Sequence, residues 1–522
     1  MKNANHIIEK VLVEVNTSNV ETAHAIKNNI DVFLKDELFP QIEILFDDYQ
    51  FEDGIIRFDE INLSFSLNKW EDFNGLKNEI YKQLKEKIDS RANQGFQSEN
   101  VKNNEFNFDK KDVQKVSTDF NTSEVFLFFL ENGYLPWFGR REQFDTFIDT
   151  EKWSKALEIE SFTHKFERLL VTNEVAVERF IIQFSDDIIL QYLIRNNSGI
   201  KKEVPGILKV IKNLEHSSRL LFLKLMLCIS QNEYDNLFKS LTFLESSILK
   251  SGGTVLGSKE KQVIKEIKGI VQKLIPENVL NQSGFTKNKN RIVDKPFEKE
   301  DLKKGDTRDL FKNDKNENEG IVADEIGKEL ITGDKADIER IVQYKLKENV
   351  TFLEKDKNEI WVQNAGLILL HPFLKPFFIT TEICDKQGKF LAEDYDLSIQ
   401  SLHYLATGDE NFFEGNLIFE KFLCGVPLKI PVRKTSVLTG LIKTEATVLL
   451  NEVVKNWPAL KNTSADGLRQ MFIQRDGKLI QKEDSYKLIV ERKAQDVLLE
   501  KLNWNISMVK LPWISKIVFT EW

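Results

Sequence analysis

The sequence predicts a multidomain α+β protein with an N-terminal βαβ-type unit, a central α-helical region and a C-terminal mixed α+β domain. Its 522 residues are too many for one hydrophobic core, since domains usually hold about 100–200 residues. Apolar residues recur every three or four positions through the middle of the chain, which is typical of helices. Both ends add segments in which apolar and polar residues alternate, which is typical of strands.

The N-terminal domain is predicted at 1–90 as a strand–helix–strand unit that a second helix closes. Residues 6–15 are rich in β-branched and aliphatic side chains and predict the first strand. Alternation of apolar and polar residues over 55–67 predicts the second strand. The pattern of residues 70–90 predicts the closing helix.

A long helix is predicted between these two strands. Ser18 or Asn19 is expected to cap its N-terminus, because both side chains accept hydrogen bonds from free backbone N–H groups. Its apolar residues form one buried stripe that runs to about residue 48. Pro40 lies inside it and is expected to kink it, because proline lacks the backbone N–H that a helix requires.

Two polar segments separate the folded parts. Residues 91–121 are rich in Asn, Gln, Ser, Lys and Asp and predict a linker, and residues 281–345 predict a longer, flexible polar linker. Between them, 122–280 predicts short helices that form either a bundle or a solenoid-like stack. Residues 350–522 predict the C-terminal α+β domain.

The dipeptide Asp476-Gly477 is a strong signal for a tight turn in that last domain. It predicts a small β-hairpin between residues 471–474 and 478–480, because Asp-Gly favours the turn types that join two antiparallel strands. Residues 486–491 alternate and are expected to pair nearby.

Charge and cysteine content exclude several classes of protein. The net charge is −9, and basic residues are interleaved with acidic ones, whereas nucleic-acid binding needs clustered Lys and Arg. The three cysteines, Cys228, Cys384 and Cys424, form no CxxC pair and predict neither a disulfide framework nor a structural zinc site. No signal peptide and no apolar stretch of membrane-spanning length is recognisable, so we expect cytoplasmic synthesis and no membrane insertion.

No constellation of residues predicts catalysis. GxSxG, HExxH and phosphate-binding Gly-Lys-Ser/Thr motifs do not occur in the sequence. His371 and His403 stand at irregular spacings from Cys384 and Cys424, so packing or hydrogen bonding explains them better than a zinc site does. We therefore expect a protein that is not an enzyme and that needs no cofactor or metal.

Several stretches, taken in order, resemble the tape measure proteins of contractile injection systems, the extracellular phage-tail-like particles. In the C-terminal domain they are NAGLILLHPFL (364–374), LHYLATG (402–408), LCGVPL (423–428), WPALKNTS (457–464), GLR (467–469), FIQRDGKL (472–479), VERK (490–493), WNIS (504–507), KLPW (510–513) and the final EW. Weaker matches are LFP (38–40), IRFDEI (56–61) and GYLPW (133–137).

Within these stretches one set of residues is the candidate set for contacts with partner proteins. It comprises Leu135, Pro136, Trp137, His371, Pro372, Trp457, Pro458, Lys461, Asn462, Arg475, Gly477, Arg492, Lys493, Trp504, Leu511, Pro512, Trp513 and Trp522. The tryptophans are either core residues or interface anchors, since tryptophan serves well in both places. For Trp522, at the end of the chain, we expect a contact with a partner.

The resemblance implies a structural component that controls the length or assembly of the tail tube. The partners that it implies are the tail tube, baseplate hub, spike or cap proteins, with assembly in the cytoplasm and possible retention inside the released particle. One alternative is an assembly chaperone or adaptor that docks on the hub or cap. A second alternative is an effector carried as cargo.

The length of the chain sets a problem for a tape measure. A continuous helix of this chain spans about 780 Å, and an extended chain reaches roughly 1,700 Å, whereas compact domains are far shorter. If the chain is a stretched ruler, deletion of 281–320 is expected to shorten the tube. Truncation after Ile506 is expected to abolish assembly if the tryptophan-rich end is a docking surface.

Overall fold

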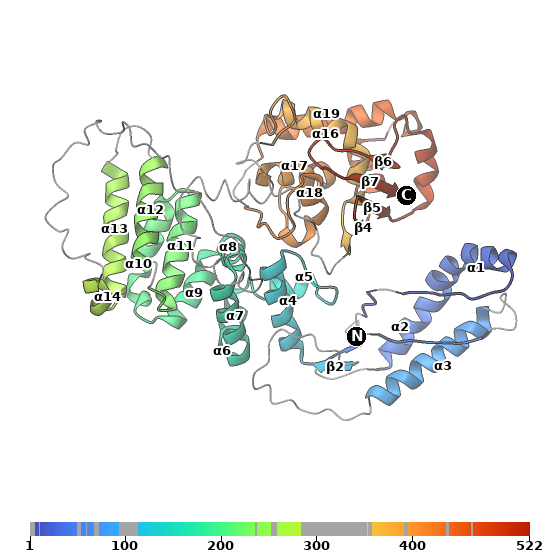
Figure 1. The fold of residues 1–522 in the computed structure, drawn as a ribbon, viewed down its shortest axis with the longest axis horizontal. Helices are drawn as coiled ribbons and strands as arrows, with labels where there is room; N and C mark the ends of the chain where they lie inside the picture. The colour runs from blue at the N-terminus through green and yellow to red at the C-terminus, as the bar shows by residue number, and fades with distance from the viewer. Residues whose placement is uncertain are drawn as a thin grey trace, which may run out of the picture. The chain divides into compact units, whose positions relative to one another are not determined.

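The computed structural model describes residues 6–9, 11–49, 54–58, 60–66, 73–92, 113–234, 237–251, 258–282, 352, 358–390, 395–434, 438–460 and 463–522. The chain forms two compact units (Figure 1). The first holds Met1–Phe129 and Leu135–Phe166, and the second holds Leu130–Tyr134 and Glu167–Trp522. Helices predominate, and the C-terminal part adds a five-stranded sheet. The domain boundaries drawn from the sequence stay predictions.

The long N-terminal helix consists of three consecutive segments, α1 (Val20–Val32), the π-helical η1 (Phe33–Leu38) and α2 (Phe39–Asp47). Asn19 caps it, because its side-chain oxygen accepts a hydrogen bond of 2.8 Å from the backbone N–H of Glu21. The π-helical turn ends two residues before Pro40, which lies in the first turn of α2, and its wider turn is where the helix accommodates the proline ring.

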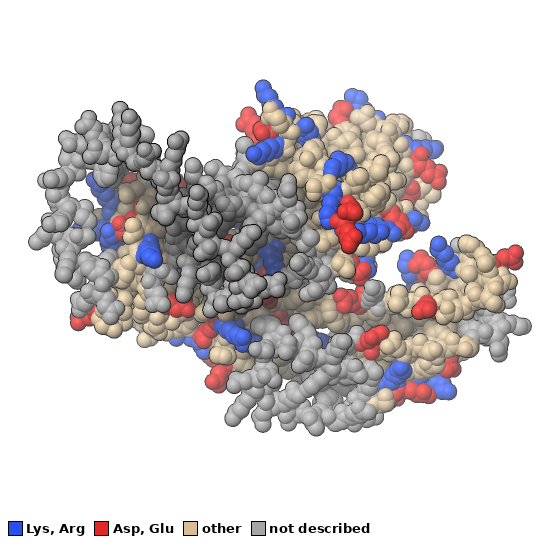
Figure 2. Space-filling view, viewed as in Figure 1, with Lys and Arg blue, Asp and Glu red and all other residues tan. Residues whose placement is uncertain are grey.

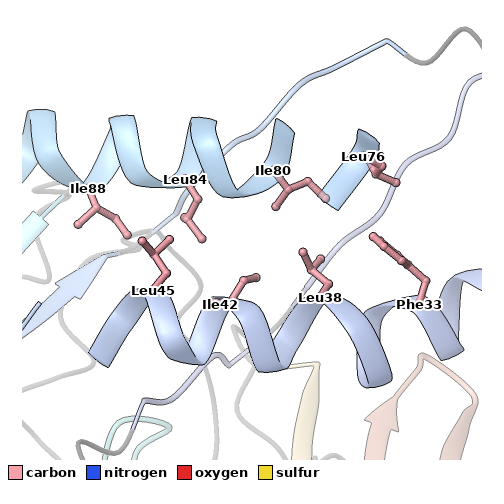
Figure 3. Packing of buried hydrophobic residues seen from close by; sticks show 8 residues of the cluster. All are labelled: Phe33, Leu38, Ile42, Leu45, Leu76, Ile80, Leu84 and Ile88. Carbon is pink, nitrogen blue, oxygen red and sulfur yellow. The ribbon is translucent and has the colours of Figure 1, made fainter. Parts of the chain in front are cut away.

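Helix α3 (Phe73–Ala92) runs parallel to this helix, and the two share one apolar core (Figure 3). The buried side chains are spaced three to five positions apart on each helix, so each set lines one face. They are Phe33, Leu38, Ile42, Leu45, Leu76, Ile80, Leu84 and Ile88.

The predicted N-terminal βαβ-type unit is wrong. Residues 6–9 and 11–17, where the first strand was expected, belong to no ladder, because no described segment pairs with them. Of the second expected strand only β1 (Ile55–Phe58) forms. It pairs antiparallel with β2 (Val113–Val116), which lies inside the expected linker 91–121. The pairing is therefore non-local and cannot be inferred from patterns within 1–90.

The rest of the first unit packs around aromatic rings. Its helices are α4 (Thr118–Asn132), α5 (Arg141–Asp145), α6 (Thr150–Glu158) and the greater part of α7 (Glu160–Thr172). Ring centroids in the core lie 4.2–6.1 Å apart, the spacing at which aromatic pairs attract. The rings belong to Phe126, Phe147, Trp153, Phe162 and Phe166.

The second unit begins with short helices joined by brief loops. They are α8 (Glu174–Gln183), α9 (Asp186–Asn196), α10 (Ile200–Asn213), α11 (His216–Ser230), α12 (Leu237–Ser251), α13 (Ser258–Leu274) and α14 (Glu277–Gln282). Helix α10 packs on both α11 and α13, and α12 packs on the same two helices. Helices α10 to α13 therefore form a bundle, one of the two arrangements expected from the sequence (Figure 1).

The C-terminal part contains a sheet of order β3-β4-β5-β7-β6. Neighbours are antiparallel except β5 and β7, which are parallel. The strands are β3 (Glu359–Val362), β4 (Gly477–Gln481), β5 (Ser485–Val490), β6 (Met508–Val509) and β7 (Ile517–Glu521).

Helices and short helical turns accompany this sheet. The α-helices are α16 (His371–Thr380), α17 (Tyr395–Thr407), α18 (Ile418–Leu423), α19 (Gly440–Asn456) and α20 (Ala465–Leu468). The turns are η3 (Ala365–Leu370), η4 (Glu414–Asn416), η5 (Pro458–Leu460), the π-helical η6 (Arg469–Ile473) and η7 (Ala494–Lys501).

The expected hairpin around Asp476-Gly477 is wrong in its turn. Gly477 begins β4, and the turn between β4 and β5 lies at 482–484, where Lys482 N–H donates to the Ser485 carbonyl at 2.9 Å. A Cβ atom on Gly477 would lie 2.6 Å from the Ala365 Cβ atom. Glycine is therefore required here for close packing of β4 against η3, and not for a reverse turn.

Candidate functional site

A buried ion cluster joins the helices of the second unit to its C-terminal part. It consists of Arg179 on α8, Glu414 in η4 and Lys421 on α18, and all three side chains are 0% exposed. Glu414 Oε1 lies 3.2 Å from Arg179 Nε and 2.8 Å from Lys421 Nζ. One carboxylate therefore neutralises part of the charge of two cations, one of which is 235 positions away in the sequence.

Backbone carbonyl groups accept the remaining hydrogen bonds of the two cations. Arg179 donates through Nη1 to the Leu130 carbonyl and through Nη2 to that of Lys429. Lys421 Nζ donates to the carbonyls of Leu428 at 3.0 Å and Ile430 at 2.8 Å. Burial lowers the pKa of Lys421, and the Glu414 carboxylate opposes that shift. The cluster is thus fully hydrogen-bonded, as a buried charge must be to persist.

Gly133 makes room for this cluster. Its φ of 81° lies in the left-handed region, which favours glycine. A Cβ atom there would lie 2.7 Å from Arg179 Nη2 and 3.0 Å from Glu414 Oε1. The glycine that opens the GYLPW stretch is therefore explained by the close approach of the guanidinium group.

Two further contacts support the same junction. Gln183, also on α8, donates through Nε2 to the Val432 carbonyl at 2.7 Å. The charge of Arg433 acts on His216 at the start of α11. Hydrogen bonds from α8 thus reach the short segment of the C-terminal part between Leu428 and Arg433, and the charge at its end acts on α11.

His216 makes the second unit sensitive to acid. Burial lowers the pKa of His216 from 6.5 to about 4, and the charges of Arg433 and Arg219 act in the same direction. The folded state therefore holds this imidazole neutral at a pH where the unfolded chain protonates it. Its contribution to stability is present above pH 6.5 and is lost as the pH falls toward 4.

We expect the urea midpoint of the chain to decrease as the pH is lowered through this window, and His216→Gln to make that decrease smaller. His164→Gln, at an exposed position on α7, is the matched control. Equal pH dependence in the wild type and in His216→Gln would contradict the assignment.

A second buried arginine holds the C-terminal end of the chain. Arg475, 0% exposed, forms an ion pair of 2.9 Å between Nη2 and Asp496 Oδ1, and its Nε donates to the Met471 carbonyl at 2.7 Å. The other carboxylate oxygen of Asp496 accepts from the indole N–H of Trp522 at 3.1 Å and from the backbone N–H of Lys493. Trp522 is therefore tied to its own domain, and the partner contact expected for it stays a prediction.

The other signature tryptophans also donate their indole N–H groups within the domain. Trp457 donates to the Leu498 carbonyl at 3.0 Å, Trp504 to that of Leu369 at 2.9 Å, and Trp513 to that of Leu423 at 2.5 Å. Trp457 is completely buried, while Trp504 and Trp513 are half-buried. These three residues join helices and turns that are far apart in the sequence, which is the work of core residues.

The remaining candidate residues do not gather at one site. Three of them are buried, namely Pro136, Gly477 and Leu511. Two are half-buried, Leu135 and His371, and His371 Nε2 lies 2.9 Å from the Asn505 carbonyl oxygen. Six are exposed: Trp137, Pro372, Pro458, Arg492, Lys493 and Pro512. Lys461 and Asn462 lie outside the described residues. A role in partner contacts stays a prediction for this set.

Reasoning from the sequence missed the buried ion cluster. Arg179, Glu414 and Lys421 are single charges among 73 basic and 82 acidic residues, and their pairing depends on contacts across the chain. One local signal was available, because Glu420 and Lys421 stand between apolar residues in Ile418–Leu423, where a charge needs a buried partner.

The described residues contain no cluster of three His, Cys, Asp or Glu side chains able to hold a metal ion. In the described part of the chain, no helix combines the length and apolar character that crossing a membrane requires. Basic and acidic side chains are interspersed on the face shown in Figure 2.

In the second unit, buried charges join the helices that follow Glu167 to the C-terminal part. The model of the family described as contractile injection system tape measure protein matches residues 5–522. The chain therefore belongs to this family and serves as a tape measure, a structural component of a phage-tail-like contractile injection system. Neither the search of curated proteins nor the search of solved structures found a match.

Proposed function

We propose that the chain enters tail assembly with the second unit closed and that growth of the tube opens this unit at the buried ion cluster. The observation that carries the proposal is the buried ion pair between Arg179 and Glu414, 235 positions apart. While this pair is intact, α8 and the C-terminal part are held together. A chain in this state has a shorter reach than the same chain with the unit opened.

While the unit is closed, residues 281–345 do not add to the distance that the chain can span. The described chain leaves the helices at Gln282, and at Phe352 it is back on the C-terminal part, where the Phe352 and Phe422 rings lie 5.2 Å apart. The polar segment thus begins and ends on one unit. Its residues add to the reach of the chain only after that unit opens.

The chemistry of the cluster suits an element that closes and later opens. Removing charges from water is costly, so a buried ion pair contributes little net stability compared with apolar residues of the same volume. The same cluster is highly specific, because each charge left without its partner is strongly unfavourable. Such a junction fixes one closed arrangement and still leaves opening accessible.

We also propose which proteins the chain contacts and where the particle is assembled. As partners we propose the tail tube and the baseplate hub, spike or cap proteins of the same particle, with assembly in the cytoplasm. The structural family supports a role without catalysis. The alternative of an assembly chaperone predicts that purified particles lack the chain, whereas a tape measure that is drawn out within the tube predicts its presence there during growth.

Tube length measured by electron microscopy tests the proposal. Deletion of 281–320 is expected to shorten tubes by about 60 Å if the opened segment is helical and by roughly 130–140 Å if it is extended. An insertion of equal length in the same segment is expected to lengthen them equally. Unchanged tube length in both variants, with normal particle numbers, would show that the unit stays closed and would overturn the proposal.

A further inference from the structure

The buried ion cluster is divided unequally between the helices and the C-terminal part. Helix α8 contributes the guanidinium group of Arg179, whereas the C-terminal part contributes Glu414, Lys421 and the carbonyl group of Lys429. These three residues lie between positions 414 and 429, but Arg179 is 235 positions away from Glu414. One arginine from the helices therefore enters a place that a short stretch of the C-terminal part builds. We call this place the guanidinium socket.

Lys421 fixes the socket from within the C-terminal part. Its Nζ donates to Glu414 Oε1 at 2.8 Å, which holds the carboxylate in position. It also donates to the carbonyl groups of Leu428 at 3.0 Å and Ile430 at 2.8 Å, the residues on either side of Lys429. The backbone at Lys429 is therefore restrained from both sides. All three hydrogen bonds join residues of the C-terminal part, so they do not require α8.

The socket stays balanced in charge when the arginine leaves it. Glu414 and Lys421 form an ion pair, and both side chains are 0% exposed. Removal of Arg179 takes away one positive charge and leaves this pair complete, whereas removal of Glu414 would leave two cations without a counter-ion. We therefore expect the socket to keep its geometry when α8 is moved away from it.

The positions of the acceptors suit a guanidinium group better than an ammonium group. Arg179 Nε lies 3.2 and 3.3 Å from the two carboxylate oxygens of Glu414, and Nη2 donates to the Lys429 carbonyl. Nη1 donates in another direction, to the Leu130 carbonyl at the end of α4. A planar fork of donors can serve all of these acceptors at once, but the compact ammonium group of lysine cannot.

We infer that the C-terminal part contains a preformed binding site for a guanidinium group and that Arg179 of the same chain is its ligand. The role of this site rests on the opening proposed above: when the second unit opens, the site loses Arg179 and stays ready to bind it again. Because the acceptors fit one orientation of the guanidinium group, the unit recloses with α8 in the same register. Opening is then reversible.

Rescue of Arg179→Ala by methylguanidinium chloride tests the inference in the purified full-length chain. Alanine keeps α8 helical and removes the ligand, and methylguanidinium supplies a guanidinium group of the same shape. Concentrations of about 1–20 mM cover the affinity expected of so small a ligand. We expect the thermal midpoint of Arg179→Ala to rise by about 2–4 °C and to saturate, because the ligand binds the folded state.

Saturation-transfer NMR on the methyl protons of methylguanidinium is the second measurement. It reports binding even where the unit stays open, because the socket belongs to the C-terminal part. We expect binding to Arg179→Ala and much weaker binding to the wild type, in which Arg179 occupies the socket. Methylammonium chloride at the same concentration is the control for charge and ionic strength, and it should neither bind nor raise the midpoint.

Arg219→Ala is the matched control variant. Arg219 lies on α11 of the same unit and pairs with Asp186, and the two side chains are 20% and 32% exposed. Methylguanidinium should not raise the midpoint of this variant, because its ion pair lies in contact with water and has no comparable set of fixed acceptors.

No binding of methylguanidinium to Arg179→Ala would overturn the inference, and so would equal effects of methylguanidinium and methylammonium or equal effects on Arg179→Ala and Arg219→Ala. An Arg179→Ala chain that has lost the near-ultraviolet circular dichroism of packed tryptophans would contradict a preformed site. None of these results depends on tube length. Rescue together with unchanged tube lengths in the 281–320 variants would reject the proposed opening and keep the site, and the reverse combination would reject the site alone.

Discussion

Glu414→Ala is expected to destabilise the second unit by about 3–5 kcal/mol, because it leaves two buried cations without their counter-ion. Arg179 and Lys421 have 0% exposed side chains and cannot regain water without moving α8 or α18. Urea denaturation followed by circular dichroism measures the loss as a lower midpoint. The effect is a large fraction of the total stability of a typical domain.

Glu410→Ala is the matched control, because Glu410 lies close in sequence and pairs with Lys443. In that ion pair the lysine and glutamate side chains are 35% and 41% exposed, so its loss is expected to cost less than about 1 kcal/mol. If Glu414→Ala were as mild as Glu410→Ala, the cluster would contribute nothing to holding the unit closed.

Truncation after Ile506 is expected to prevent the C-terminal sheet from forming. It removes β6 and β7, and β7 pairs with β5 along its whole length. It also removes Leu511 and Val518, which are 1% and 0% exposed, and the indole of Trp513. The truncated chain should lack the near-ultraviolet circular dichroism of packed tryptophans and should be largely insoluble.

Because the truncated domain is expected to unfold, the truncation cannot test whether the C-terminal end is a docking surface. A loss of particles would report unfolding of the domain, and not the loss of a surface. The double variant Arg492→Glu and Lys493→Glu is a better probe of docking, because both residues are exposed. A truncated chain with wild-type stability would contradict the structural role of β7.

Patterns within one helix predicted local structure well. Spacing of apolar residues placed the long N-terminal helix and α3, and the preference for side-chain oxygens at helix N-termini limited the cap to Ser18 or Asn19, of which Asn19 is the cap. Pro40 was expected to interrupt its helix, and the π-helical turn before it is the form that this interruption takes. These features depend on residues a few positions apart, so the sequence contains the information needed.

Features that depend on distant pairs could not be predicted in this way. Strand β1 finds its partner in β2, beyond α3, although residues 6–15 have the better strand composition. Glu414 finds Arg179 across more than two hundred positions. For the candidate contact residues, the motifs marked positions of importance, but they did not distinguish residues that build the core from residues that face a partner.

A double-mutant cycle on Arg179 and Glu414 tests the central claim, that the helices and the C-terminal part of the second unit are one closed unit. Arg179→Ala, Glu414→Ala and the double variant are compared with the wild type by urea denaturation. We expect a coupling free energy above about 1.5 kcal/mol, because the two charges are in contact and out of water. A coupling near zero would mean that α8 and η4 do not meet in solution, and would contradict the account.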